Sequence, residues 1–151
     1  MEDRYLYRAK RKNWRELPKD IWWVEGYLYG IWERRYILWG MTNDVPNMIG
    51  VDPSTICQYT GLKDKNGKLI WEGDIILFQR DNDDCPFTNK DTKKRFGKVF
   101  YKGFRTTFAI GMGKNGSSSI NDDLWKYVQN GNRVEVIGNK FDNPELLEVG
   151  E

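Results

Sequence analysis

The stretch QYTGLKDKNGKLIWEGDIILF, from Gln58 to Phe78, decides the fold of this chain. Asn66 and Gly67 form the pair that is most favoured in a type I′ turn, where both central residues need a positive φ. We therefore expect residues 58–62 and 68–71 to form two strands joined by a polar turn.

The same stretch continues with an acidic pair around a glycine, Glu72-Gly73-Asp74, and then an apolar run at 75–78. A short apolar run bounded by turn residues is typical of a buried strand. Two carboxylates two positions apart on a strand face the same side, so Glu72 and Asp74 are also candidates for a general acid and base. A charged pair around glycine before a strand is more often a turn. We therefore assign structural turn roles to Asn66, Gly67 and Gly73.

The composition restricts the class of protein. The chain has 151 residues, 39% of them hydrophobic and 15% aromatic, and its net charge is +2. These values are typical of a soluble globular protein and do not by themselves imply a polyanionic partner. The chain has no histidine, which excludes Ser-His-Asp and Cys-His catalysis. We expect no cofactor and no metal.

The location is predicted from what the sequence lacks. The start, MEDRYLYRAKRK, has no apolar segment typical of a signal peptide, and no apolar run is long enough to span a membrane. Two cysteines, Cys57 and Cys85, are too few for a four-thiolate zinc site. We expect a cytoplasmic protein with two reduced, buried thiols.

Aromatic residues at period two predict strands on either side of the opening stretch. Tyr5 and Tyr7, Tyr27 and Tyr29, and Tyr36 and Leu38 have this spacing. Glu25-Gly26 is interpreted as a hairpin turn, and residues 41–55 as a loop because of their Asn, Asp, Pro and Gly content. The density of aromatic residues between Ile21 and Trp39 predicts an exposed face that favours self-association.

One short helix is expected near residues 119–131. Ser119 or Asn121 would cap it, and Asp122 and Asp123 would lie in its first turn, where the helix dipole favours negative charge. The last strand would cover residues 133–141. Asn143 and Pro144 then favour a single helical turn near the end of the chain.

A basic and aromatic strip is the main candidate binding site. The segment TKKRFGKVFYKGFR has no acidic residue, and its candidate nucleic-acid-binding residues are Lys93, Lys94, Arg95, Phe96, Lys98, Lys102 and Arg105. Basic side chains with interleaved rings are what proteins use to bind single-stranded nucleic acid. The alternative is the solvated face of a hairpin whose rings pack in the core.

A glycine-rich segment, GMGKNG, matches the dinucleotide-binding pattern at Gly111, Gly113 and Gly116. That pattern binds a pyrophosphate only where a strand precedes it and a helix begins at its third glycine. Three serines follow here, and the neighbouring strands have the pattern of antiparallel hairpins. We therefore interpret the segment as a surface loop.

Two motifs resemble those of the YopX-like family of phage and prophage proteins. The first is QYTGLKDKNGK with the following EGDI, and the second is VIGNKFDNPELL near the end of the chain. YLYRAK is similar to the family's opening strand, except that Lys10 stands where an aromatic residue is usual. Residues 13–53 and 79–91 match nothing specific in the family. The resemblance implies a small, mainly β protein of a phage or prophage, and it implies no enzyme activity or catalytic residue.

These observations predict one mainly β domain over residues 1–151. N-terminal strands and a loop would occupy 1–57, a small SH3-like barrel 58–138 and a C-terminal tail 139–151. We expect a phage or prophage accessory protein in the bacterial host that binds a partner, in the first place a protein, and is not an enzyme. A homo-oligomer is a second expectation. The alternative function is a nucleic-acid-binding module that uses the strip at 93–105.

Overall fold

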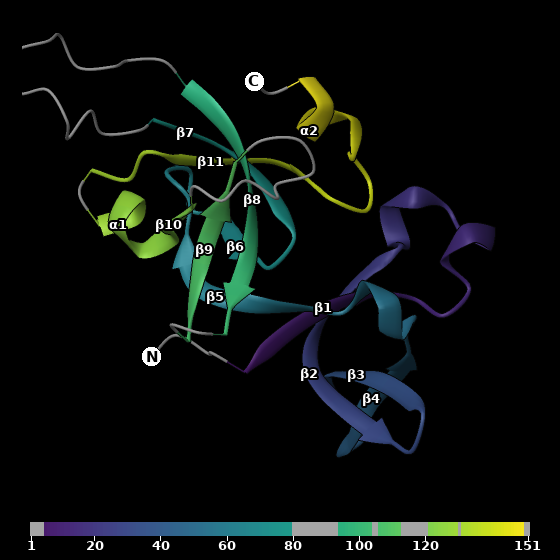
Figure 1. Ribbon diagram of the computed structural model, residues 1–151. Coiled ribbons are helices and arrows are strands. Elements are labelled where there is room, and N and C mark those ends of the chain that lie inside the picture. The colour runs from purple at the N-terminus through teal and green to yellow at the C-terminus, as the bar shows by residue number, and fades with distance from the viewer. Residues whose placement is uncertain (1–4, 80–93, 104–105, 113–120, 130, 150–151) are drawn as a thin grey trace, which may run out of the picture. The chain divides into compact units, whose positions relative to one another are not determined.

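The computed structural model describes residues 5–79, 94–103, 106–112, 121–129 and 131–149 (Figure 1). The chain divides into two compact units, Met1–Gly61 and Leu62–Glu151. Strands dominate both units, so the prediction of a mainly β fold is confirmed. Within the described residues, no helix has both the length and the apolar character needed to cross a membrane.

The strands of the first unit belong to a six-stranded sheet with the order β4-β3-β2-β1-β5-β6. The strands of this unit are β1 (Leu6–Lys10), β2 (Trp23–Ile31), β3 (Arg34–Thr42), β4 (Val45–Gly50) and β5 (Cys57–Lys63), the last of which continues into the second unit. Three short 3-10 helices lie in the connections, η1 (Trp14–Glu16), η2 (Lys19–Ile21) and η3 (Pro53–Thr55). Figure 1 shows β2, β3 and β4 side by side. One face of this sheet carries the core of the unit, formed by Ala9, Val24, Ile37 and Val51.

The predicted hairpin turn at Glu25-Gly26 is wrong. Both residues lie inside β2, where Glu25 pairs with Arg8 and Gly26 with Tyr7. Gly26 serves close packing instead of chain reversal, since a Cβ atom there would lie 2.1 Å from the carbonyl oxygen of Leu38. The chain reverses later, at Trp32-Glu33 between β2 and β3.

The predicted loop at residues 41–55 is also wrong in part, because β4 lies within it. Asn43 and Asp44 both have positive φ and connect β3 to β4 in a two-residue turn, as a type I′ hairpin requires. Pro46 is tolerated because β4 is the edge strand of the sheet, where a missing backbone N–H leaves no neighbouring carbonyl unpaired.

The second unit contains a five-stranded antiparallel sheet with the order β10-β9-β8-β7-β11 (Figure 1). Its elements are β6 (Leu69–Trp71), β7 (Asp74–Gln79), β8 (Lys94–Lys102), β9 (Thr107–Gly111), β10 (Asn121–Asp123), α1 (Leu124–Gln129), β11 (Val134–Asn139) and α2 (Glu145–Val149). The core lies on one face of this sheet and includes Ile76, Phe78, Val99 and Ile110, with Leu124 and Tyr127 of α1 packed against them.

The predicted barrel is not closed among the described strands. The sheet ends at β10 on one side and at β11 on the other. The outer edge of β11 is bonded to a turn instead of to a further strand: the backbone N–H of Lys65 donates to Val134 O at 2.9 Å, and that of Val136 donates to Asp64 Oδ2 at 3.0 Å. Because the turn at Asp64 and Lys65 bonds to the edge of β11, these backbone groups are satisfied without closure of the sheet into a barrel.

The expected hairpin of the opening stretch is present as the end of β5 and β6. Gly67 has a φ of 81°, whereas Asn66 is not in the positive region, so the turn is not type I′. The carboxylate of Asp64 determines the turn geometry, because its Oδ1 accepts from the N–H groups of Asn66 at 2.8 Å and Lys68 at 2.9 Å. Gly67 alone then supplies the left-handed residue.

Gly73 is also at a positive φ, 85°, as its assigned turn role requires. Its N–H donates to Val99 O and its carbonyl accepts from Lys140, each at 2.8 Å. The glycine therefore links β8 to the segment after β11. A side chain at this position would be strained by the backbone conformation.

The predicted helix is shorter than expected and begins later. Asn121–Asp123 form β10, which pairs with β9, so the two aspartates are strand residues and not a first helical turn. The helix α1 begins at Leu124. Near the end of the chain, α2 begins at Glu145, directly after Pro144, and Leu146 N donates to Asn143 O at 3.1 Å.

Candidate functional site

One face of β2, β3 and β4 in the first unit carries a group of exposed apolar side chains. Side chains at every second position of a strand share a face, and the register extends that face across the sheet. Tyr27 pairs with Leu38, Tyr29 with Tyr36, and Leu38 with Met48. We call this surface the tyrosine face, and it consists of Tyr27, Tyr29, Ile31, Tyr36, Leu38 and Met48.

The tyrosine face lies opposite the core face of the same sheet. Ile37 and Leu28, at the alternate positions, belong to or pack against the core. Tyr27, Tyr29, Ile31 and Met48 each expose between 42% and 52% of their surface. The rings of Tyr29 and Tyr36 lie 6.5 Å apart, which makes them a contiguous aromatic pair.

Trp32 stands at the turn between β2 and β3 with 93% of its surface exposed. Its φ is 53°, a conformation that costs a side-chain-bearing residue about 1–2 kcal/mol. Arg35 holds this turn, because its Nη1 donates to Trp32 O at 2.6 Å and to Arg34 O at 3.0 Å. The turn thus presents a large ring to solvent at an unfavourable backbone conformation.

The side of the sheet that carries the tyrosine face is covered at the end away from Trp32. Trp23 and Lys10 are paired there, and Lys10 is only 1% exposed. Its Nζ lies 3.9 Å from the centroid of Trp14, 4.4 Å from that of Trp22 and 5.4 Å from that of Trp23. This tryptophan cage holds a cation by the attraction of the ring faces. The cage is filled by the protein's own lysine, so we do not interpret it as a ligand site.

A carboxylate fastens the cage to the rest of the unit. Trp14 Nε1 donates to Asp52 Oδ2 at 3.1 Å, and Ser54 donates to Asp52 Oδ1 from its backbone and its hydroxyl. Burial would raise the pKa of Asp52, but the hydrogen bonds from Ser54 and Trp14, with the charge of Arg15, together hold it below its ordinary value.

The basic and aromatic strip is divided between two faces of the second sheet. Lys94, Phe96, Lys98 and Lys102 alternate along β8 and share one face with Phe100. Arg95 pairs with Phe78 and therefore lies on the opposite, core face. Lys93 and Arg105 lie outside the described residues.

The face that carries these lysines is covered in part. The short helix α2 packs against β8, and Ile75 and Ala109, which share this face by register, are fully buried. Phe96 and Phe100 are half-buried, while Lys94 is exposed. Burial, and then the charge of Lys140, hold the pKa of Lys98 below its usual value. The lysines thus point to the same side of β8. The rings of Phe96 and Phe100 between them are half-buried and are not fully available for stacking.

The comparisons with known proteins agree with the two sequence motifs. The family model described as YopX protein matches residues 7–148. The chain belongs to the YopX protein family. No curated protein has a significantly similar sequence. Among solved structures, the crystal structure of protein EF1440 from Enterococcus faecalis is similar with a TM-score of 0.50 and 20% sequence identity, over 93% of this chain and 96% of that one. This likeness concerns the fold.

In this YopX-family protein the acidic pair of the opening stretch is separated by its environment. Asp74 is 1% exposed, and its Oδ2 accepts from the backbone N–H of Trp71 at 2.8 Å, so it organises the turn before β7. Glu72 is half-buried. Of the glycine-rich motif, Gly113 and Gly116 lie outside the described residues. No group of His, Cys, Asp or Glu among the described residues has the arrangement of a metal site.

Sequence reasoning found the aromatic density of β2 and β3 in this YopX-family protein but missed two parts of the surface. Met48 was assigned to a loop, although Asn43 and Asp44 before it are residue types that type I′ turns favour. Trp32 was not singled out, because nothing in the sequence distinguishes a tryptophan at a turn from one inside a strand. Cys57 is buried and not in a disulfide, and Cys85 lies outside the described residues.

Proposed function

We propose that this YopX-family protein is a phage- or prophage-encoded accessory protein that acts in the bacterial cytoplasm by binding another protein and not by catalysis. The observation that carries the proposal is the tyrosine face, a contiguous apolar surface on one side of β2, β3 and β4. Exposed apolar patches of this kind mark interaction sites on soluble proteins. Tyrosine and tryptophan are enriched where partners bind most strongly.

Trp32, in the turn that follows Ile31 of the tyrosine face, is the residue whose substitution separates binding from folding. Replacing Trp32 with glycine removes the ring and relieves the positive φ, so the melting temperature should stay the same or rise. We expect the affinity for the protein partner to fall by roughly thirtyfold or more, the effect of losing a hot-spot ring.

The measurement is affinity capture from prophage-induced cells, followed by titration of the purified partner. Trp125→Ala is the matched control, because Trp125 is also exposed but lies in α1 of the second unit. Loss of the partner with Trp32→Gly and its retention with Trp125→Ala supports the proposal. Equal binding by both variants and the unmodified protein contradicts a role for this surface.

A nucleic-acid-binding function is the second candidate, and one observation favours it. Lys94, Lys98 and Lys102 share a face of β8 with Phe96 and Phe100, in the alternation of charge and ring that single-strand binding uses. The partial burial of Phe96 counts against stacking on its ring. Binding here would therefore rest on phosphate contacts, with little contribution from the rings.

This second function predicts a steep salt dependence. Replacing Lys94, Lys98 and Lys102 by serine should lower the slope of log affinity against log salt concentration by about 2, since each phosphate contact to a single strand contributes about 0.7. The measurement is fluorescence anisotropy with a labelled thymidine oligonucleotide. A control with the exposed Lys12, Lys63 and Lys68 replaced by serine removes the same charge elsewhere. If the two triple variants lose affinity alike, the strip is only a charged surface.

A further inference from the structure

The tyrosine face is bounded by opposite charges at its two ends. Glu25 precedes Tyr27 by two residues on the same side of β2 and is exposed. Arg34 is also exposed and pairs with Ile31 at the far end of the hairpin. Six residues of extended strand separate these ends, about 20 Å at 3.3 Å per residue. The apolar side chains lie between the two charges.

The Glu25 end of the face is closed by the chain itself. Arg8, which pairs with Glu25, is largely buried, and its guanidinium lies 4.7 Å from the centroid of Trp23. Beyond it, Trp14 and Trp22 cover Lys10. The aromatic side chains that cover this face therefore end just before Glu25. Among the described residues of the first unit, Tyr27 and Tyr29 continue the same face with 50% and 42% of their surface exposed.

The adjoining edge of the sheet is unsuited to pairing with another strand. Pro46 lies in β4, the edge strand, and has no N–H to donate to a neighbouring chain. Proline on an edge strand is a common means of preventing strand addition. A protein partner of this region is therefore expected to pack on the face and not to extend the sheet.

We propose that the tyrosine face binds a second copy of this chain about a two-fold axis that passes between Tyr27 and Tyr29. This inference rests on the proposed function of the face as a protein-binding surface. Under a two-fold axis the same patch meets itself, so each residue at one end lies against the residue at the other end. Glu25 of one copy then pairs with Arg34 of the other, twice per dimer.

The charges are what single out a second copy among protein partners. A surface with a negative and a positive end around an apolar centre is complementary to itself when it is rotated by half a turn. Tyrosine packing would supply the buried area, while the two ion pairs would fix the register. Any other partner would need the reversed charges at the same spacing.

The experiment is a charge exchange followed by sedimentation equilibrium. We expect the unmodified chain to form a dimer at high micromolar concentration. Glu25→Arg and Arg34→Glu should each weaken the dimer by roughly tenfold or more, because each places like charges together at both ends. The double variant, Glu25→Arg with Arg34→Glu, should recover most of this loss. Tyr29→Ser should also weaken the dimer.

Several outcomes would overturn the inference. The inference is overturned if the unmodified chain is a monomer at high micromolar concentration. It is also overturned if the double variant dimerises no more tightly than the weaker-binding single variant. Melting temperatures are measured for each variant, because Arg8 lies across from Glu25. If the chain is monomeric but Trp32→Gly still abolishes capture of a different protein, the second copy is rejected and the proposed function stands. If neither dimer formation nor protein capture depends on this face, both the dimer and the proposed protein-binding function are rejected.

Discussion

Replacing Gly26 by alanine is expected to lower the free energy of unfolding of the first unit by about 3 kcal/mol. A Cβ atom at this position would lie 2.1 Å from the carbonyl oxygen of Leu38 and 2.9 Å from Cγ2 of Ile37. The first of these is a backbone atom of the neighbouring strand, so it cannot move away without disturbing the pairing of β2 and β3. The measurement is urea unfolding followed by tryptophan fluorescence.

Gly30→Ala provides the control for this prediction, because it lies in the same strand. The three atoms nearest to a Cβ atom there belong to the side chain of Arg35, the first of them Nη1 at 3.1 Å. These are side-chain atoms that can shift by a few tenths of an ångström, at most at the cost of the exposed hydrogen bonds from Arg35 to the turn, so we expect a smaller loss of about 1 kcal/mol. Equal unfolding free energies for the two alanine variants would show that the close approach of β2 and β3 at Gly26 is not a constraint.

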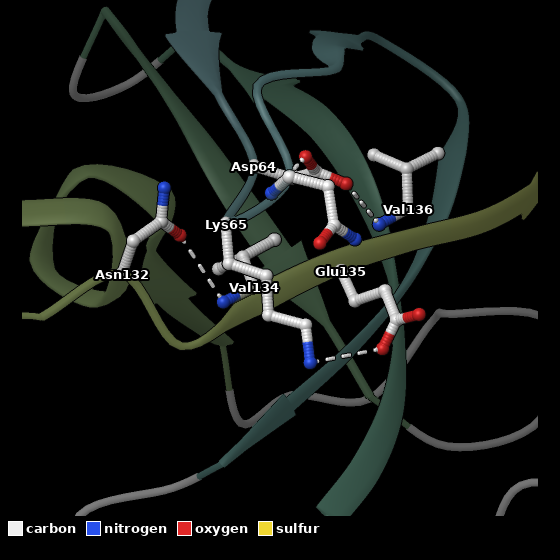
Figure 2. Close-up of polar contacts among 7 residues, drawn as sticks. Asp64, Lys65, Asn132, Val134, Glu135 and Val136 are labelled. Carbon is white, nitrogen blue, oxygen red and sulfur yellow. Dashed lines mark hydrogen bonds and ion pairs between the residues drawn. The ribbon is translucent and has the colours of Figure 1, made fainter.

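Replacing Asp64 by alanine should lower the free energy of unfolding of the second unit by about 3 kcal/mol. Asp64 is 4% exposed, and its carboxylate accepts from the N–H groups of Asn66, Lys68 and Val136. Figure 2 shows Asp64 beside Val136, with Lys65 and Glu135 on the same turn and strand. Alanine would leave these donors without their acceptor and would remove one of the two hydrogen bonds that join the turn to the edge of β11.

The control variant here is Glu135→Gln, which breaks a neighbouring interaction of a different kind. The ion pair between Lys65 Nζ and Glu135 Oε2, at 3.2 Å, is partly exposed on both sides. Such pairs contribute about 0–1 kcal/mol. Chemical denaturation of both variants gives the comparison. A loss for Asp64→Ala no larger than that for Glu135→Gln would mean that water replaces the carboxylate at little cost.

The conformation of a turn was predictable from the sequence where only one physical reason explains the residue type found there. Gly67 and Gly73 were assigned turn roles, and both adopt the positive φ that favours glycine. Gly26 was misread because glycine also serves close packing, and only the position of Leu38 in three dimensions shows which reason applies. The type of the turn at Asn66 was missed because a side chain outside the pair, that of Asp64, determines it.

Long-range arrangement was less predictable. The closure of a barrel depends on which groups meet the edge of β11, and Val136 meets a carboxylate 72 residues earlier in the chain. The spacing of apolar residues in the sequence does not indicate that contact. In the same way, strand alternation puts Lys94, Lys98 and Lys102 on one face of β8, but the contact between α2 and β8 depends on the path of the chain after β11.

The tyrosine face was partly visible in the sequence. Period-two spacing marked Tyr27, Tyr29, Tyr36 and Leu38, and their density predicted more aromatic surface than a small fold can bury. The spacing could not reveal which face holds the core, since both faces of β2 carry apolar side chains. The positions of Ile37 and Val24 in the core decide that.

The tryptophan cage gives the first unit an optical signal of its own. The rings of Trp14 and Trp22 lie 4.8 Å apart at an interplanar angle of 69°, close enough for their electronic transitions to couple and produce a paired band in the circular dichroism spectrum. The second unit contains only Trp71 and Trp125. Melting of the two units can therefore be followed separately in the unmodified chain, without an added label.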